Sequence, residues 1–406
     1  MLDYDVLVVG GGIHGVGVAQ AAAARGYRTL LVEKERLAAG TSSRSSKLIH
    51  GGLRYLESLE LRLVRECLRE REILTRIAPD LVNWVPFFIP IYDHSSRGPW
   101  TIRAGLSLYA LLGGLREKAR YSRIAPDELE RLDGLQRDGL RAVFRYWDAH
   151  TDDAALTSAV MRSAEELGAE LRCPATLVRA HAVDGGYEAT LEGADGVATV
   201  TASIVVNATG PWIEEIHRRV DPAPVPPESL QISLVQGTHL LFDEPLDRGV
   251  YYTEAPRDRR PVFVMPWQDG TLVGTTERVH EGPPETVTPH ESEIEYLCEA
   301  YAHYFPERDG DHLSAFAGLR VLPSSGNVNR RSRETMLLVD DEAHPHWLTI
   351  AGGKLTSYRA TAQQVLARLR ATLPAPTADH DTAELPLPVN SPIEKIAPPR
   401  LEPRTP

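Results

Sequence analysis

The chain begins with an alternation of apolar runs and glycine turns that predicts a β-strand, an α-helix and a second β-strand. Residues 5–10 form a short apolar run with a polar start, and residues 13–26 form an alanine-rich segment that ends at a glycine. Such a segment is typical of a buried helix with a glycine C-cap. A second apolar run follows at residues 27–33. This order of elements predicts the first βαβ unit of a parallel sheet.

The rest of the chain divides into helical segments, strand-like segments and a proline-rich end. Residues 78–145 mix prolines, aromatic residues and an amphipathic stretch, and they do not continue the opening pattern. Residues 372–406 carry many prolines and no apolar periodicity, which predicts an extended or disordered tail. Helices are predicted over 58–77, 152–168, 290–304 and 354–370, and strands over 175–183, 186–192, 197–206, 335–339, 347–350 and, as an antiparallel sheet, 231–276.

A glycine turn joins the first strand to the first helix. Gly10, Gly12 and Gly15 occupy the glycine positions of a G-x-G-x-x-G motif. The first glycine allows the tight turn, the second lets a pyrophosphate approach the backbone, and the third lets the helix pack on the strand. The helix N-terminus then presents free N–H groups to the phosphates. Ile13 and His14 therefore belong to the predicted site, His14 as a spectator beside the phosphates.

An acidic residue closes the second strand. Glu33 stands where a carboxylate can accept hydrogen bonds from both hydroxyls of a ribose, and Lys34 follows it in the predicted site. The negative charge of Glu33 would repel a 2′-phosphate and so disfavours NADP. Strand, glycine turn, helix and terminal acid together predict a dinucleotide site.

Two later segments favour FAD over NAD. Residues 205–210 are an apolar strand that ends in small residues, where the chain can pass close to a dinucleotide. Residues 350–356 form a second strand–glycine–helix junction, and a helix N-terminus there can stabilise negative charge on a reduced flavin. Two ordinary glycine turns would give the same pattern. The predicted cofactor contacts in these segments are Ala208, Thr209, Gly210, Gly353, Lys354, Leu355 and Thr356.

Residues 41–56, with the sequence TSSRSSKLIHGGLRYL, closely resemble the signature of FAD-dependent glycerol-3-phosphate dehydrogenases. These enzymes belong to the D-amino-acid-oxidase-like flavoproteins. The resemblance spans residues 1 to about 370 and continues through the motifs at 207–212, 236–239, 274–276, 318–320 and 352–359.

Three departures from the family pattern stand out. Glu277 occupies a position that is usually Asp, and Val321 occupies one that is commonly Pro. The helical C-terminal domain usual in the family is lacking, and the proline-rich residues 372–406 stand in its place. These departures bear on assembly, membrane docking and the choice of substrate.

The resemblance and the pattern together imply an α/β fold with α+β elaborations. We expect a Rossmann-like FAD-binding domain, interleaved with an antiparallel-sheet substrate domain and followed by a tail. The FAD-binding domain is expected in residues 1–77, 146–224 and 325–371, the substrate domain in 78–145 and 225–324, and the tail in 372–406. The flavin contacts that the resemblance adds are Thr41, Ser42, Ser43, Ser46, Lys47, Leu48, His50, Gly51 and Val178.

Oxidation of a secondary alcohol by a flavin needs a hydride path to N5, an acceptor for the hydroxyl proton and anchors for the phosphate. The planar fork of arginine matches the oxygens of a dianionic phosphate. The resemblance places Arg54, Arg320 and, as the loosest match, Arg333 at the substrate face of the flavin. Lys354 and Tyr55 complete the predicted substrate site.

Two histidines are candidates for the proton acceptor, since both have an ordinary pKa near neutrality. His50 lies in the motif at residues 41–56, here called the flavin loop, where it can instead orient the flavin or the loop. His239 lies in a strand, where it can instead be a core histidine with satisfied hydrogen bonds. We favour His239, and the expected catalytic residues are Arg54, His239, Arg320 and Lys354.

Composition narrows the partners and the compartment. The net charge of −12 argues against nucleic acid as the main partner. The three cysteines lie far apart, match no metal-ligand spacing and suit a reducing cytoplasm, so no metal is expected. No apolar run approaches the ~18–20 residues that span a bilayer. Membrane contact would be peripheral, on the inner face of the cell membrane, and the sequence is compatible with an oligomer.

A basic stretch at residues 97–123 offers one route to such contact. It carries six Lys or Arg residues against one acid, interspersed with apolar residues. An amphipathic basic helix of this kind can lie on an anionic membrane. A helix packed on its own protein with charged edges has the same pattern, and the sequence favours neither.

The leading hypothesis is oxidation of sn-glycerol 3-phosphate to dihydroxyacetone phosphate, with a quinone as electron acceptor. A second hypothesis keeps the flavin but replaces the substrate by another hydroxy acid or an amine, with oxygen as acceptor. A third is a truncated protein that binds FAD without turnover. The joint presence of Arg54, Arg320 and Lys354 speaks against the third, because a scaffold has no physical need for them together.

Overall fold

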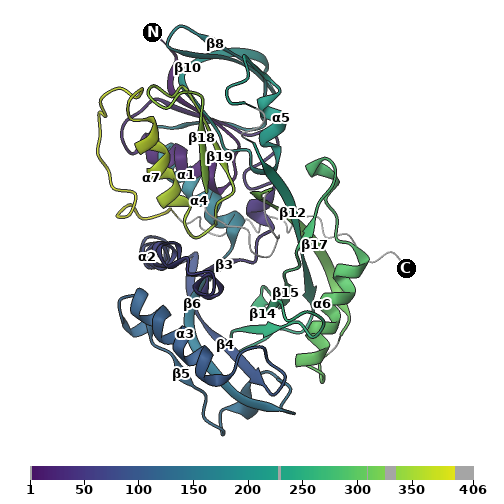
Figure 1. The fold of residues 1–406 in the computed structure, drawn as a ribbon. Helices are drawn as coiled ribbons and strands as arrows, with labels where there is room; N and C mark the ends of the chain where they lie inside the picture. Colours follow the sequence, from purple (N-terminus) through teal and green to yellow (C-terminus); the bar gives the residue numbers. More distant parts are fainter. Residues whose placement is uncertain (1, 227–229, 309, 325–334, 389–406) are drawn as a thin grey trace.

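The computed structural model describes residues 2–226, 230–308, 310–324 and 335–388 of the 406-residue chain. Two sheets lie one above the other in the view of Figure 1, and long strands connect the two levels. The mixed α/β architecture, with a Rossmann-like dinucleotide-binding fold and an antiparallel second sheet, confirms the predicted fold class.

The first sheet has nine strands and a parallel centre. Its order is β11-β8-β9-β10-β1-β2-β7, and β19 pairs with both β10 and β18. The pairings of β1 with β2 and β10, of β2 with β7 and of β10 with β19 are parallel. The strands are β1 (Tyr4–Val9), β2 (Thr29–Val32), β7 (Glu170–Arg172), β8 (Ala175–Val183), β9 (Gly186–Gly193), β10 (Gly196–Asn207), β11 (Val220–Asp221), β18 (Met336–Val339) and β19 (Trp347–Ala351).

Three helices, α1 (Ile13–Ala23), α4 (Asp153–Glu166) and α7 (Tyr358–Leu369), pack together beside this sheet, and α5 (Ile213–His217) follows β10. Helix α1 is buried along nearly its whole length, which explains its run of small residues. A Cβ at Gly17 would lie 2.8 Å from the ring of Tyr358, so glycine permits the close approach of α1 to α7. Asp152 caps α4 by accepting from the Ala155 N–H at 2.9 Å. The predicted βαβ opening is confirmed.

The second sheet has ten strands, most of them antiparallel. Its order is β16-β12-β15-β14-β13-β4-β6-β3, with β17 on β12 and β5 on β6. Helix α6 (Glu291–Tyr304) packs on β12, β14 and β15, and its apolar face buries Leu297 and Tyr301. The strands are β3 (Leu48–Ile49), β4 (Val82–Tyr92), β5 (Ser122–Arg123), β6 (Leu140–Thr151), β12 (Ile232–Phe242), β13 (Val250–Glu254), β14 (Pro261–Trp267), β15 (Gly270–Gly274), β16 (Arg278–Val279) and β17 (His312–Pro323).

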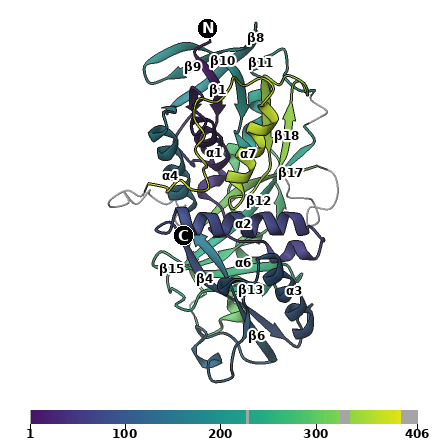
Figure 2. The same ribbon diagram turned by 90° about the vertical axis from the view of Figure 1, so that its left-hand side faces the viewer.

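Helix α2 (Leu61–Ile77) crosses the molecule between the two sheets (Figure 2). Strand β3 and the end of β6 pair within the second sheet. The segments 1–77 and 146–224 are predicted for the FAD-binding domain, but residues 48–49 and 146–151 lie in strands of the second sheet. Each sheet with the helices packed on it is one folding unit, and both units therefore contain parts of these segments. The exact domain limits stay a prediction.

Helix α3 (Pro99–Leu112) packs on α2 and β6 and carries part of the basic stretch. Arg97 forms ion pairs with Glu57 and Glu254, so this cation is held by the protein itself. The opposite surface of α3 leaves the Trp100 and Leu111 side chains largely exposed. No helix within the described residues is long and apolar enough to cross a membrane.

One local prediction is wrong. The last helix begins at Tyr358 and not at Lys354, because Gly352 and Gly353 adopt positive φ angles of 81° and 102° and turn the chain before it can wind. Residues 372–388 lie without helix or strand against the first folding unit, which agrees with the extended alternative predicted for the tail; residues 389–406 lie outside the described part of the chain.

The ordered part of the tail is fixed by backbone pairing and by a few apolar anchors. The Leu387 N–H donates to the Ile77 carbonyl at 2.8 Å, and the His380 N–H donates to the Ala24 carbonyl at 3.0 Å. The Leu387 side chain is buried in the core around α1. Such anchors need no sequence periodicity, which is why the proline-rich composition concealed them.

Candidate active site

One large cavity lies where the two folding units meet. Its volume is about 1310 Å³, above the roughly 300–1,000 Å³ of a site for a drug-sized ligand. It is lined by the β1–α1 turn, the end of β2, most of residues 39–60, the start of β8, the end of β10, strand β17 and the loop at 352–356. A cavity of this volume has room for a dinucleotide together with a small substrate.

The predicted glycine turn forms one end of the cavity. Gly10 has a φ of +109°, and a Cβ on it would lie 2.8 Å from the Ala208 carbonyl oxygen. A Cβ on Gly15 would lie only 1.9 Å from the Gly10 carbonyl oxygen. The backbone is therefore packed as a phosphate-binding turn requires. At the start of α1, the Ile13 N–H donates to Ser42 Oγ at 2.9 Å.

Glu33 lines the cavity at the end of β2 and organises the backbone around it. One carboxylate oxygen accepts from the Gly11 N–H at 2.7 Å, and the other accepts from the Glu35 N–H at 2.9 Å. Lys34 forms an ion pair with Glu285 at 3.4 Å and lies over the ring of Trp212. These contacts hold the predicted ribose site between the two folding units.

The loop at 352–356 carries a buried cation into the cavity. Within the described residues, the Lys354 ammonium is buried without a hydrogen-bond partner and lies 3.5 Å from the centre of the Tyr55 ring. His14 packs against Gly353, and burial lowers the pKa of His14 to about 4, so the imidazole is neutral at pH 7. The backbone N–H of His50 donates to Thr356 Oγ1 at 3.1 Å, which connects the loop at 352–356 to the flavin loop.

Strand β17 brings Arg320 to the cavity. Its guanidinium donates to the Thr276 carbonyl at 2.6 Å and pairs with Glu277 at 3.4 Å. Glu277 is one of the two residues that depart from the family pattern, and its side chain is nearly buried. Arg54 and Tyr55 line the same cavity from the turn of 3-10 helix at Leu53–Leu56. Arg333 lies outside the described residues.

His239 lies on β12 and faces the cavity from within the protein. Its Nε2 is 2.9 Å from Ser46 Oγ, and its ring stacks on Phe316 at 5.1 Å between centroids. Burial, reinforced by the positive charges of Lys47 and Arg320, lowers the pKa of His239 to about 3. The imidazole is therefore neutral near pH 7, which is the form that can accept a proton.

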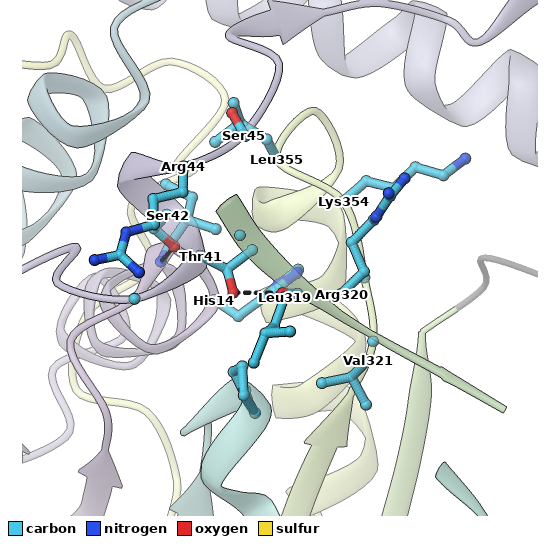
Figure 3. A pocket seen from close by; sticks show the side chains of 18 of the residues that line it. His14, Thr41, Ser42, Arg44, Ser45, Leu319, Arg320, Val321, Lys354 and Leu355 are labelled. Atoms are coloured by element: carbon cyan, nitrogen blue, oxygen red, sulfur yellow. Dashed lines mark hydrogen bonds between the residues drawn. The ribbon is translucent and has the colours of Figure 1, made fainter. Parts of the chain in front are cut away.

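Cations stand on two sides of this region (Figure 3). Arg320 and Lys354 lie on one side, and Arg44 lies on the other, with Thr41 between them donating to the Leu319 carbonyl at 2.6 Å. Arg44 is a lining residue that our sequence reasoning missed, although it stands inside the motif at 41–56. Burial lowers the pKa of its guanidinium, and Arg36 nearby adds to this effect.

Five predicted cofactor residues do not line the cavity. The Lys47 ammonium is buried against Asp153 at 2.6 Å, and the Gly51 N–H donates to the Tyr109 hydroxyl at 2.8 Å. The Val178 side chain is exposed, while its neighbours at 175–177 line the cavity. Arg260, by contrast, lines the cavity although no motif marked it. The five residues outside the lining are Gly15, Ser43, Lys47, Gly51 and Val178.

The other predicted residues within the described chain are all brought to the cavity. They are Gly10, Gly12, Ile13, His14, Glu33, Lys34, Thr41, Ser42, Ser46, Leu48, His50, Arg54, Tyr55, Ala208, Thr209, Gly210, His239, Arg320, Gly353, Lys354, Leu355 and Thr356. Their individual roles stay predictions.

Comparison with known proteins agrees with this site. The model of the FAD dependent oxidoreductase family matches residues 5–359. A glycerol-3-phosphate dehydrogenase of Pseudomonas aeruginosa is 38% identical over 407 residues, which cover 97% of this chain and 76% of that protein. A D-erythritol 1-phosphate dehydrogenase of Brucella abortus is 37% identical over 391 residues, covering 95% of this chain and 77% of that protein.

A solved structure shares the fold. The glycerol-3-phosphate dehydrogenase from Bacillus halodurans, solved with FAD, superimposes with a TM-score of 0.72 at 27% identity, over 95% of this chain and 67% of that one. Fold and site thus define an FAD-dependent oxidoreductase. Within this class, the chain belongs to the family of the FAD-dependent glycerol-3-phosphate dehydrogenases.

The residues present fit FAD. The cradle at Gly10 and Gly15 leaves no room for a Cβ, as close approach of a pyrophosphate requires. The buried Lys354 ammonium is without a hydrogen-bond partner among the described residues, and a buried charge of this kind needs an anionic or polar group beside it. Both observations agree with a bound anionic cofactor or substrate.

Proposed function

We propose that this enzyme oxidises sn-glycerol 3-phosphate to dihydroxyacetone phosphate and passes the electrons to a quinone. The observation that carries the substrate assignment is the set of cations that line the cavity. Arg54, Arg320 and Lys354 all line it, and the Lys354 ammonium is buried without a protein hydrogen-bond partner in the described residues. A small dianionic substrate would satisfy this charge.

Each of these residues has a separate part in the proposed reaction. Arg320 is held by the Thr276 carbonyl and by Glu277, so its fork is oriented before the substrate arrives. Arg54 supplies a second guanidinium from the 3-10 turn at Leu53–Leu56, and the Tyr55 hydroxyl of the same turn can hydrogen-bond a substrate oxygen. Bound FAD supplies the two-electron acceptor for the alcohol carbon.

The hydroxyl proton needs an acceptor that is unprotonated near pH 7. His239 is neutral near pH 7, and Ser46 holds one of its ring nitrogens at 2.9 Å. Its Nδ1 is buried and has no hydrogen-bond partner among the described residues. We propose His239 as the proton acceptor. His50 is the alternative, and its backbone link to Thr356 favours a role in holding the flavin loop.

The test of the substrate is anaerobic reduction of the enzyme-bound flavin. sn-Glycerol 3-phosphate is expected to bleach the yellow flavin absorbance within the time of mixing and measurement. Glycerol, which lacks only the phosphate, serves as the matched control and is expected to leave it oxidised. A holoenzyme that stayed oxidised with glycerol 3-phosphate would exclude this substrate.

A longer polyol phosphate is a second candidate, because a relative with 37% identity is named a D-erythritol 1-phosphate dehydrogenase. The cations of the cavity suit the phosphate of either substrate. The ratio of kcat/KM for erythritol 1-phosphate to that for glycerol 3-phosphate decides between them. A ratio above one would move the assignment to the longer substrate.

The electron acceptor is tested separately. Reoxidation of the reduced enzyme by a short-chain quinone is expected to be much faster than reoxidation by air. Rapid peroxide formation in air would favour an oxidase, with a hydroxy acid or an amine in the substrate panel as the alternative. The exposed Trp100 and Leu111 on α3 support peripheral contact with a membrane. Salt-dependent co-sedimentation with anionic liposomes tests that contact.

A further inference from the structure

A buried chain of polar groups runs from helix α2 to the flavin loop. Arg71 donates to one oxygen of Asp148, and the other oxygen accepts from the Tyr109 hydroxyl at 2.7 Å. The Tyr109 oxygen in turn accepts from the backbone N–H of Gly51 at 2.8 Å. All four residues are buried, and Arg71 and Asp148 have no solvent exposure. Elements α2, β6 and α3 thus converge on one backbone donor.

The direction of every hydrogen bond in this chain is fixed. A backbone N–H and a guanidinium can only donate, so Tyr109 gives its single proton to Asp148, and Asp148 accepts on both oxygens. This requires an ionised carboxylate. Burial raises the pKa of Asp148, and the charge of Arg71 opposes that rise. Burial also raises the pKa of Tyr109 far above its usual range, so this hydroxyl keeps its proton.

This series of hydrogen bonds ends at the part of the flavin loop that leads to the substrate residues. Gly51 is followed by Gly52 at a φ of +74° and then by the short 3-10 turn that carries Arg54. On the other side, the His50 N–H is held by Thr356 at 3.1 Å. Two adjacent backbone donors are therefore fixed by two different parts of the protein.

The fit at Gly51 leaves little freedom. A Cβ on Gly51 would lie 2.5 Å from the Tyr109 hydroxyl and 2.6 Å from Leu68. The backbone at this position consequently follows the place of the Tyr109 oxygen. Hydrogen bonds fix both the distance and the angle between donor and acceptor, whereas an apolar contact fixes neither so closely.

We propose that the hydrogen-bonded series Arg71–Asp148–Tyr109 positions the flavin loop by holding the Gly51 N–H. The three residues are positioning residues, since none of them lines the cavity. Their effect reaches His50 and Arg54 through the backbone. This inference rests on the proposed function only for the substrate used in one of its assays.

Tyr109→Phe removes the hydroxyl and leaves the ring in place. The matched control is Tyr304→Phe, because Tyr304 is equally buried and its hydroxyl donates to the Glu254 carbonyl at 2.6 Å, away from the loop. Two readouts on the holoenzymes need no substrate: hydrogen exchange of the peptide that contains Gly51, and the visible absorption spectrum of the flavin. A third is the rate of flavin reduction by glycerol 3-phosphate.

Tyr109→Phe is expected to retain FAD, to speed exchange at Gly51, to alter the flavin spectrum and to slow flavin reduction about tenfold or more. Tyr304→Phe is expected to change none of these. Unchanged exchange and an unchanged spectrum in Tyr109→Phe would overturn the proposal. Because these two readouts need no substrate, their outcome is independent of the substrate assignment.

A second variant guards against a folding defect. Arg71→Lys keeps the buried positive charge but removes the planar fork that faces Asp148. It is expected to change exchange at Gly51 and the flavin reduction rate in the same direction as Tyr109→Phe. A slower reduction without faster exchange at Gly51, in either variant, would count against positioning.

Discussion

A buried ion pair joins helix α7 to helix α2, and its loss should destabilise the enzyme strongly. Arg359 makes a two-pronged contact with Glu70, at 2.8 Å from Nε and 2.7 Å from Nη2. A third donor of Arg359 reaches Thr382 in the C-terminal segment at 3.2 Å. The two side chains are 8% and 2% exposed, so water cannot replace the missing partner when one is removed.

The magnitude follows from this burial. Arg359→Met leaves the Glu70 carboxylate buried without its counter-charge, which costs about 3–5 kcal/mol. Replacing both residues by Met removes the two charges together, and the double variant is expected to recover most of that loss. The difference between the double variant and the sum of the singles measures the coupling of the pair.

The assay is urea unfolding of the holoenzyme, followed by circular dichroism and by the release of FAD fluorescence. Arg359→Met is expected to lower the midpoint with the slope unchanged. Arg76→Met is the control, since the Arg76–Glu384 pair also starts from α2 and joins it to the C-terminal segment at 2.8 Å, but lies exposed. It is expected to change nothing measurable. Equal midpoints for the two variants would refute the reasoning.

Three further outcomes test the site. Gly15→Ala should abolish FAD retention, because its Cβ would lie 1.9 Å from the Gly10 carbonyl oxygen; Gly105→Ala, with open space around it, should leave the ratio of flavin to protein absorbance unchanged. Arg320→Ala should lower kcat/KM for glycerol 3-phosphate about 10- to 150-fold, because a hydrogen bond to a charged group contributes about 1.5–3 kcal/mol. A fully active variant would show that Arg320 does not bind the substrate. Since the pKa of His239 is lowered to about 3, the acid limb of kcat/KM expected near pH 6 is that of the substrate phosphate, whose second pKa is about 6, and the residual activity of His239→Gln should keep this limb; a further limb near pH 6.5 that disappears in His239→Gln would contradict the neutral, buried histidine.

Local sequence was sufficient for the elements whose chemistry is local. The turn at Gly10–Gly15 and the helix that Asp152 caps follow from backbone geometry and short-range hydrogen bonds, and both the turn and the helix are found where they were predicted. The same is true of seven strands of the first sheet, whereas the short strands β7 and β11 were not predicted. These features depend on residues within one turn of each other, which a periodicity can reveal.

Long-range pairing was not accessible in this way. The start predicted for α7 at Lys354 is four residues too early, because Gly352 and Gly353 turn the chain and the helix begins only at Tyr358. The ordered course of 372–388 depends on backbone groups of Ala24 and Ile77, which are far away in sequence. Gly51 was assigned to the flavin because its motif is local, whereas the partner of its N–H, Tyr109, comes from another helix.

The electrostatics of the cavity separate two tasks. Arg44, Arg320 and Lys354 carry fixed positive charge, while His14 and His239 are held neutral by burial. For His239, the same cation that would bind a phosphate, Arg320, also lowers its pKa. A bound dianion would offset this positive charge and so raise the pKa of His239 toward neutrality. The proposed base therefore becomes a stronger proton acceptor only when the phosphate is in place, which links proton transfer to substrate binding.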